Sequence, residues 1–222
     1  MKNLSQLIQS RYSCREYLEQ PIEPKLLQQI LTVASASPSG GNIQPWQVSM
    51  VSGESLQRLT SALCAAFDKK HPQQPDYPYY PNEWLMPWDQ RRRDCGKALY
   101  QALGVEASDK GKRIYQWRRN FQFFAAPSAI IISLDKSMAE GAMIDIGLFM
   151  QSLMLAATAA GLATCPQASI ADYPQIIRDQ LDLDQQQKII CGLAIGWPNK
   201  DAIVNRFRTT RVATDQFVRW HN

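Results

Sequence analysis

Histidine is scarce in this sequence of 222 residues, which contains only His71 and His221. Neither is placed for a Ser-His or Cys-His nucleophilic pair, because one lies in a proline-rich stretch and the other is the penultimate residue. The five cysteines form no C-x-x-C pair, and no H-E-x-x-H or P-loop motif occurs. We therefore expect neither a metal site nor a hydrolytic site. An enzyme without such side chains usually takes its chemistry from a cofactor.

A strong excess of one charge and a secretory leader are also lacking. The formal net charge is only +4, and the three arginines at 91–93 are flanked by Asp89 and Asp94. This pattern favours a solvated helix start over a nucleic-acid site. The first seventeen residues lack the apolar core of a signal peptide, and the odd number of unpaired cysteines is typical of reduced thiols. We predict a cytoplasmic protein with no nucleic-acid partner.

Only one hydrophobic run, residues 142–163, is long enough to span a bilayer. Asp145, Gln151, Ser152 and Thr158 interrupt it, and no basic cluster flanks it. We predict a helix buried on nearly all sides, in a deep core or a large subunit interface, with no membrane partner.

The remaining periodicity predicts an α+β fold with a central mixed or antiparallel sheet flanked by helices. No G-x-G-x-x-G follows a predicted strand, so a Rossmann domain is not expected. We treat residues 1–222 as a single domain. The predicted helices cover residues 3–10, 24–34, 54–67, 90–104, 108–124, 142–161 and 173–180, and the strands cover 47–51, 128–134, a short segment ending near 165, and 188–195.

Residues 68–89 break this pattern with five prolines and five tyrosine or tryptophan residues. A long loop that carries its own aromatic side chains is more often functional than disordered. We therefore predict that residues 68–124 form a lid-like insertion with its own helices.

Three polar segments carry candidate binding chemistry, and each also has a simpler structural interpretation. Residues 11–15 (RYSCR) combine two guanidiniums and a hydroxyl that suit a phosphate, but they also fit a solvated helix end. Residues 38–46 (PSGGNIQPW) contain two glycines that allow a flat ligand to approach the backbone, or simply form a turn into a strand. Residues 205–211 (NRFRTTR) are basic, as many solvated tails are.

Taken together, these segments resemble the nitroreductase family of FMN enzymes over nearly the whole chain. The family motif Arg-x-Ser-x-Arg/Lys is matched at 11–15, and Pro-Ser-x-x-Asn-x-Gln-Pro-Trp is matched at 38–46. A Gly-Leu-x-x-x-Pro turn is matched at 161–166, Gly-x-x-x-Gly at 192–196, and an arginine-containing tail at 208–211. The stretches 81–105, 119–124 and 164–168 look like the nitrobenzoate-reductase branch.

The resemblance implies a nitroreductase-like fold and a homodimer, with FMN at the interface and helix 142–161 in the dimer core. It also implies an oxidoreductase that uses NADH or NADPH as co-substrate and reduces a small aromatic acceptor, nitroaromatic or quinone-like, in a ping-pong cycle. No protein side chain would be catalytic, because hydride would pass through N5 of FMN.

The resemblance assigns cofactor-binding roles residue by residue. Arg11, Ser13, Arg208 and Arg211 would bind the FMN phosphate, and Arg15 would lie near the pyrimidine edge of the flavin, within the segment that also holds Tyr12 and Cys14. Pro38, Ser39 and Gly40 would reach a flavin held largely by the other subunit, with Asn42 and Gln44 supporting that loop. The turn Pro166, Gln167, Ala168 and Ser169 would pass along the ring, with the backbone donor to N5 coming from Gln167 or Ala168.

One departure from the family pattern affects the ring contacts. Many members hold the ring with an Asn and a Lys shortly before the strand that matches 128–134, where this chain has Arg118, Arg119, Asn120 and Gln122. Two alternatives stay open at this point. One is a different flavin chemistry on the same fold, such as reductive dehalogenation or flavin fragmentation. The other is a non-enzymatic basic module that binds nucleic acid.

Overall fold

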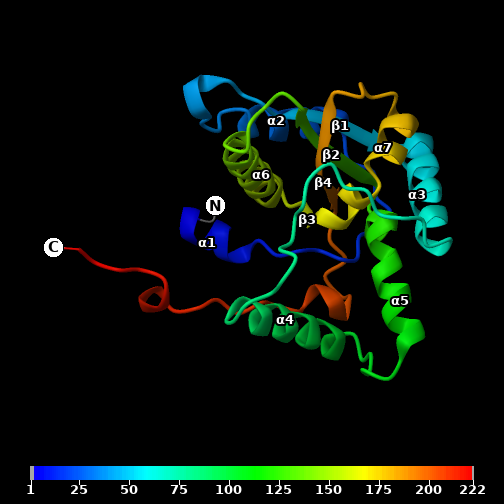
Figure 1. Cartoon of the computed structure of the whole chain (residues 1–222), viewed down its shortest axis with the longest axis vertical. Coiled ribbons are helices and arrows are strands. Elements are labelled where there is room, and N and C mark those ends of the chain that lie inside the picture. The colour runs from blue at the N-terminus through cyan, green and yellow to red at the C-terminus, as the bar shows by residue number, and fades with distance from the viewer. Residues whose placement is uncertain (1–2, 222) are drawn as a thin grey trace.

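The computed structural model describes residues 3–221 and centres on a four-stranded sheet (Figure 1). The strands are β1 (Gln47–Ser52), β2 (Ser128–Asp135), β3 (Ala163–Gln167) and β4 (Gln187–Gly196), in the order β1-β2-β4-β3. Every neighbouring pair is antiparallel. All four predicted strands and the predicted α+β class are therefore confirmed, and the sheet is antiparallel rather than mixed.

Both faces of the sheet are buried, because successive side chains of a strand point to opposite faces. On β2, Ile131 packs into one hydrophobic cluster, whereas Ile130 and Ile132 pack into the other. Helices α3 (Gly53–Asp68) and α7 (Pro174–Leu181) cover the first face. Helices α2 (Pro24–Ala34) and α6 (Ala142–Ala159) cover the second (Figure 1). The sheet is thus the middle layer of three.

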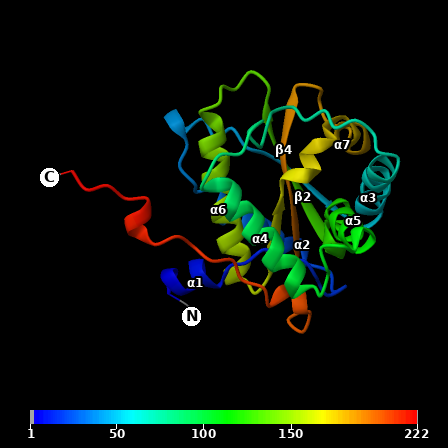
Figure 2. The same cartoon turned by 60° about the horizontal axis from the view of Figure 1, so that its bottom comes forward.

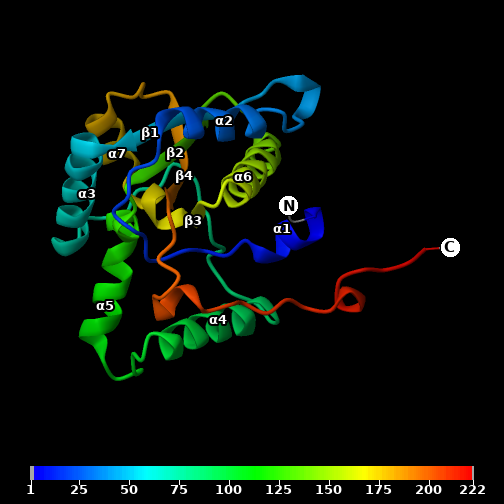
Figure 3. The same cartoon turned by 180° about the vertical axis from the view of Figure 1, so that it is seen from behind.

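The N-terminal segment begins with α1 (Leu4–Ser10), capped by a reciprocal pair of hydrogen bonds between Asn3 and Gln6. The chain then runs extended beside β3, where Ser13 forms a parallel bridge with Thr164. The segment after β4 returns past this region and continues to the C-terminus, which lies away from the body on the same side as α1 (Figures 1 and 3). The segments around Arg15 and Asn205 therefore lie together beside β3, joined by a 2.8 Å hydrogen bond from the N–H of Arg15 to Oδ1 of Asn205.

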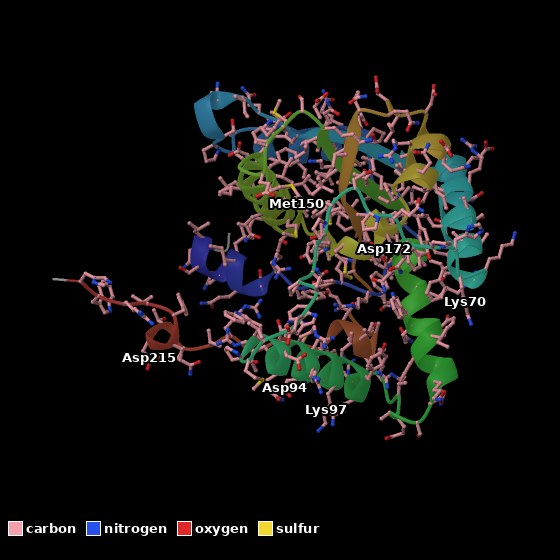
Figure 4. All side chains as sticks on the ribbon, viewed as in Figure 1. Lys70, Asp94, Lys97, Met150, Asp172 and Asp215 are labelled. Atoms are coloured by element: carbon pink, nitrogen blue, oxygen red, sulfur yellow. The ribbon has the colours of Figure 1, made fainter. Side chains whose placement is uncertain are left out.

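The insertion between α3 and β2 contains α4 (Trp88–Ala102) and α5 (Lys110–Arg118), neither of which has a buried residue within the chain. Figure 2 shows α4 on the side of the molecule that is turned forward, and Figure 4 shows Asp94 and Lys97 pointing from α4 away from the sheet. These helices confirm the predicted helical content of the insertion. Its opening and closing as a lid remains a prediction.

The predicted helix 108–124 is too long and needs correction. The α-helix ends at Arg118, and a tighter helix, η2 (Arg119–Ala125), follows with left-handed backbone at Phe123, Phe124 and Ala125 (φ 47°, 55° and 60°). Phe123 and Phe124 are adjacent in sequence, yet both are buried in the same core. Tertiary packing of the aromatic rings therefore overrides the helical periodicity that the sequence suggests.

The apolar helix α6 is less enclosed than the sequence predicts. Only 39% of its eighteen-residue apolar window is buried within the chain, whereas Ile144 and Leu148 are 69% and 42% exposed. By length and composition α6 would also suffice to cross a bilayer, but such a signal is equally given by core helices of soluble proteins. One side of α6 packs on the sheet, and an apolar side remains uncovered in the single chain.

Candidate cofactor-binding site

A cavity of about 730 Å³ is lined mainly by residues from the segments 8–15 and 207–211, and we call it the arginine cavity. Its lining, drawn from residues 3–221, includes four arginines and no aspartate or glutamate. The predicted residues that line it are Arg11, Tyr12, Ser13, Arg15, Arg208 and Arg211. A concentration of guanidiniums without a neutralising acid is a donor set for an anion with several oxygens.

The extended backbone of residues 11–15 explains the spacing of the first motif. The backbone N–H of Cys14 donates to the carbonyl of Thr164 at 3.0 Å, which holds the segment alongside β3. Alternate residues of an extended chain share a side, so Arg11, Ser13 and Arg15 line the cavity together. The Cys14 side chain is buried instead, with its thiol donating to the carbonyl of Glu16. A direct contact between Cys14 and a cofactor therefore remains only a prediction.

The C-terminal segment reaches the cavity through a stacked guanidinium. Cζ of Arg208 lies 3.9 Å from the ring centroid of Tyr12, and burial raises the pKa of this phenol to about 12, which keeps it neutral. Arg211 orients its guanidinium with a 2.6 Å hydrogen bond to Oγ1 of Thr209. Burial, and then the positive charge of Arg211, lower the pKa of Arg11. The two arginines, 200 positions apart, thus repel each other.

Arg15 is held by several neighbours at the edge of the cavity. Its guanidinium donates to the carbonyl of Ser13 at 3.2 Å and lies 6.0 Å from the ring centroid of Phe124. Arg119 donates to the backbone carbonyl of Arg15 at 3.0 Å and forms a 2.6 Å ion pair with Glu16. The region that departs from the family pattern therefore supports Arg15 with an arginine and an aromatic ring.

The predicted turn 166–169 divides between two elements. Pro166 and Gln167 are the last residues of β3, and Ala168 and Ser169 begin the short helix η3 (Ala168–Asp172). The buried Gln167 donates through Nε2 to the carbonyl of Asn120 at 2.7 Å, while its Oε1 has no partner. None of these four residues lines the arginine cavity. Their placement along a flavin ring remains a prediction.

Cys165, which precedes this turn, is a buried free thiol. Its side chain is 2% exposed, and burial raises its pKa to about 11 despite the opposing effect of Arg15. A thiol with this pKa is almost entirely protonated at neutral pH and is a poor nucleophile.

The loop 38–44 lies at the opposite end of α6 from α1. Its backbone is anchored where the N–H of Gly40 donates to the buried Asp145 at 3.2 Å, in the first turn of α6. The N–H of Gln44 donates to Oγ of Ser39, and Nε2 of Gln44 donates to the carbonyl of Asn42. Gly41, Asn42 and Gln44 all have left-handed backbone, which stores strain at non-glycine positions. Within one chain this loop, including the exposed Pro38, does not line the arginine cavity.

The predicted cofactor-binding residues omit five that line the arginine cavity, namely Ile8, Gln9, Gln151, Phe207 and Thr209, and they also omit Asn205, which supports it. Gln151 lines the arginine cavity from α6, and its only signal is that it interrupts an apolar run. Asn205 is 3% exposed, and its side chain forms hydrogen bonds with the backbone of Arg15 and Glu16. The sequence alone suggests instead that this residue belongs to a solvated basic tail. A contact between residues 190 positions apart has no local sequence signature.

The arginines at 91–93 do not form an open basic patch. Arg92 and Arg93 pair with Asp89 at 2.9 and 2.7 Å, at the i+3 and i+4 spacings of a helix. This arrangement supports the interpretation of a solvated helix start. Within residues 3–221, no group of three or more His, Cys, Asp or Glu residues is arranged to hold a metal ion.

Fold and site together define an α+β protein with an arginine-lined cavity formed by the N-terminal and C-terminal segments. The chain belongs to the nitroreductase family, because the model described as "Nitroreductase family" matches residues 8–197.

Named relatives agree with this assignment over nearly their whole length. The chain is 33% identical to a 4-nitrobenzoate reductase of Pseudomonas putida over 211 residues, which cover 95% of this chain and 92% of the relative. It is also 33% identical to a chloronitrobenzene nitroreductase of Comamonas testosteroni, with 96% and 95% covered. The predicted resemblance to the nitrobenzoate-reductase branch is thereby confirmed.

Solved structures show the same fold. The FMN and NADPH-dependent nitroreductase NfnB from sphigopyxis sp. strain HMH is 37% identical, with a TM-score of 0.96 and complete coverage of both chains. The FMN-dependent NfnB from Mycobacterium smegmatis, solved in complex with NADPH, is 28% identical, with a TM-score of 0.94 and coverage of 98% and 97%. The predicted nitroreductase-like fold is confirmed.

Proposed function

We propose that this protein is an FMN-dependent oxidoreductase that uses NADH or NADPH to reduce nitroaromatic or quinone-like compounds. The observation that carries the proposal is the arginine cavity, which four arginines and no carboxylate line. This donor set fits the phosphate dianion of FMN, because charge-assisted hydrogen bonds from planar guanidiniums suit phosphate oxygens.

In this proposal, Arg11, Ser13, Arg208 and Arg211 hold the phosphate, and Arg15 lies near the pyrimidine edge of the flavin. FMN, when bound, supplies the atom that accepts and donates hydride. The protein contributes orientation and electrostatics, which is the usual division of work in cofactor enzymes. A cation at the position of Arg15 favours negative charge on the adjacent ring edge.

The substrate class follows from the relatives. Their names identify 4-nitrobenzoate, chloronitrobenzene and nitrobenzene as compounds reduced by proteins 31–33% identical to this chain. NADPH is named for both NfnB structures. We infer a small nitroaromatic acceptor and a nicotinamide co-substrate that bind in turn at one place, as in a ping-pong cycle.

We further propose a cytoplasmic homodimer. The uncovered side of α6, with Ile144 and Leu148, offers an apolar surface that a second copy would cover. The loop 38–44 would then reach the cofactor held by the partner, which accounts for its distance from the arginine cavity of its own chain. Strained and exposed residues in this loop are consistent with a binding role.

The direct test begins with the absorption spectrum of the purified protein. We expect an oxidised-flavin band, its loss on anaerobic addition of NADH or NADPH, and its return when a nitroarene is added. Product analysis with nitroarenes and halophenols distinguishes nitro reduction from dehalogenation. If protein supplied with FMN binds none and oxidises no NAD(P)H with any quinone or nitroarene, the proposed function is wrong.

A further inference from the structure

We propose that Asn205 is a positioning residue that joins the N-terminal and C-terminal arginines into one phosphate-binding unit. The inference rests on the proposed function, because it concerns how the same cavity binds FMN. Asn205 ends the short helix η4 (Ile203–Asn205), directly before the arginine-containing tail. Its side chain is 3% exposed, so its polar atoms depend on the protein for hydrogen bonds.

The side-chain amide of Asn205 has hydrogen-bond partners for both of its polar atoms. Oδ1 accepts the backbone N–H of Arg15 at 2.8 Å. Nδ2 donates to the carbonyl of Glu16 at 2.7 Å and to the carbonyl of Asn199 at 2.8 Å. The amide therefore fixes the backbone of the first arginine motif against the chain that leaves β4.

The backbone of Asn205 contacts the arginine-containing tail. Its carbonyl accepts Nη1 of Arg208 at 2.6 Å, and this guanidinium also lies over the ring of Tyr12, in the N-terminal motif. One residue thus contacts both sources of arginine. Because Arg11 and Arg211 repel each other, the two segments need such a connection to stay together before a phosphate arrives.

Only asparagine meets these requirements at this position. Aspartate keeps the acceptor for Arg15 but loses both donors, and it adds a negative charge beside a phosphate site. Alanine leaves the backbone N–H of Arg15 without its acceptor and removes one of three donors to the carbonyl of Glu16, which also accepts from the Cys14 thiol and the N–H of Asn199. Glutamine has the same polar atoms but is longer by one methylene in a buried space.

The experiment compares FMN with riboflavin, which has the same ring but no phosphate. Dissociation constants for both are measured by flavin fluorescence quenching for the wild type, Asn205→Ala and Asn205→Asp. Gln57→Ala, on the exposed side of α3, is the matched control. We expect the Asn205 variants to lower FMN affinity on the order of tenfold more than riboflavin affinity, and the control to change neither. A general loss of stability would weaken both ligands by the same factor.

A double-mutant cycle tests the connection to the tail. If Asn205 joins the two arginine-containing segments, the loss of FMN affinity in Asn205→Ala/Arg208→Ala will be smaller than the sum of the two single losses. Equal loss of FMN and riboflavin affinity, additive effects in the cycle, or failure of both Asn205 variants to fold while Gln57→Ala folds would each overturn the inference. Absence of FMN binding by the wild type would instead contradict the proposed function itself.

Discussion

At the scale of single residues, the site depends on the alternation of an extended chain. Arg11, Ser13 and Arg15 share one side because residues 11–15 pair with β3 and do not continue α1. A solvated helix end, the simpler interpretation of this segment, would have spread the same side chains around an axis. Arg11 and Arg15 thereby line one cavity with Arg208 and Arg211 from the C-terminal segment. The four side chains differ in their burial and in their hydrogen-bond partners.

Arg11 and Arg211 are expected to contribute unequally to FMN binding. Arg11→Ala should raise the dissociation constant of FMN roughly ten- to hundredfold, because hydrogen bonds to charged groups contribute about 1.5–3 kcal/mol. Arg211→Ala should have a smaller effect, because Arg211 is more exposed than Arg11. Isothermal titration with FMN measures both, and Arg58→Ala on the exposed side of α3 is the control. Equal affinities for Arg11→Ala and the control would contradict the assignment.

The carboxyl group of Asp172 makes the stability of the protein depend on pH, because it is partly buried in the folded state. Burial raises its pKa from 3.8 to about 6 in the folded protein. A raised carboxyl pKa means that the folded state binds the proton more tightly, so stability is lost as the pH rises from about 4 to about 6. Asp172→Asn should therefore be more stable than the wild type above pH 6 by about 1 kcal/mol, after allowance for partial solvent exposure, and similar to it below pH 4. Urea unfolding at several pH values measures this, and a pH-independent difference would contradict it.

At the scale of elements, Gly192 and Gly196 of the Gly-x-x-x-Gly motif lie where a neighbouring segment packs too closely against β4 to leave room for a side chain. Gly192 on β4 faces Ile170 of η3, and a Cβ there would lie 2.6–2.9 Å from three atoms of that side chain. Gly196 similarly faces Pro127 and Tyr17. The family pattern Gly-x-x-x-Gly is therefore a packing requirement that holds η3, and with it the segment 168–169, against the sheet.

Gly192→Ala should destabilise the protein by about 1–3 kcal/mol, the usual range for overpacking a filled core. Gly96→Ala in α4 is the matched control, because a Cβ there meets nothing within 4 Å and alanine favours a helix. Denaturant unfolding measures both variants. Partial recovery in Gly192→Ala/Ile170→Val would attribute the loss to this contact, whereas a neutral Gly192→Ala would contradict it.

The insertion is anchored to the body at one end by a buried ion pair. Nη1 of Arg178 lies 2.7 Å from Oδ2 of Asp76, with side-chain exposures of 6% and 10%, and the N–H of Ile189 donates to the same carboxylate. Tyr77 adds a 2.8 Å hydrogen bond to the carbonyl of Ile190. These contacts hold the start of the loop against α7 and β4, while α4 and α5 beyond it have no buried residue.

Arg178→Met should cost about 3–5 kcal/mol, because it leaves the carboxylate of Asp76 buried without its cation. Arg118→Met is the matched control, since its pair with Asp68 is 30% and 49% exposed and is worth at most about 1 kcal/mol. Urea unfolding gives the two values, and limited proteolysis of residues 68–87 reports loosening of the anchor. Equal losses for the two variants would show that burial of this pair is unimportant.

At the scale of the whole molecule, the uncovered apolar side of α6 requires an explanation. Ile144 is 69% exposed in the single chain, and the C-terminal segment carries Phe217 and Trp220, which are 67% and 85% exposed. The helix α6 and the C-terminal segment lie on the same side of the molecule as α1 (Figures 1 and 3). A second copy would bury this surface and bring the loop 38–44 to a cofactor.

Light scattering should therefore give the mass of a dimer for the wild type. Ile144→Glu should shift the protein toward monomer and reduce bound FMN together, because a buried unpaired charge opposes association. Ser61→Glu, on α3 at the far side of the sheet (Figure 1), should do neither. A monomeric wild type with full FMN occupancy would contradict the homodimer.

The sequence by itself determined the class of fold, the positions of the strands and most helices, and the family. These properties depend on local periodicity, on turn residues and on short motifs, all of which are written within a few tens of residues. The helix predicted over 108–124 was wrong in its second half, because burial of Phe123 and Phe124 in one core outweighs their helical spacing.

Only the tertiary structure decided that Arg11, Arg15, Arg208 and Arg211 line one cavity, and that the buried Asn205 connects their two segments. It also separated the loop 38–44 from that cavity and left one side of α6 uncovered. The physical reason is that these facts are contacts between residues tens to hundreds of positions apart. Such contacts depend on how the packed layers place the segments in space, which no local pattern of residues encodes.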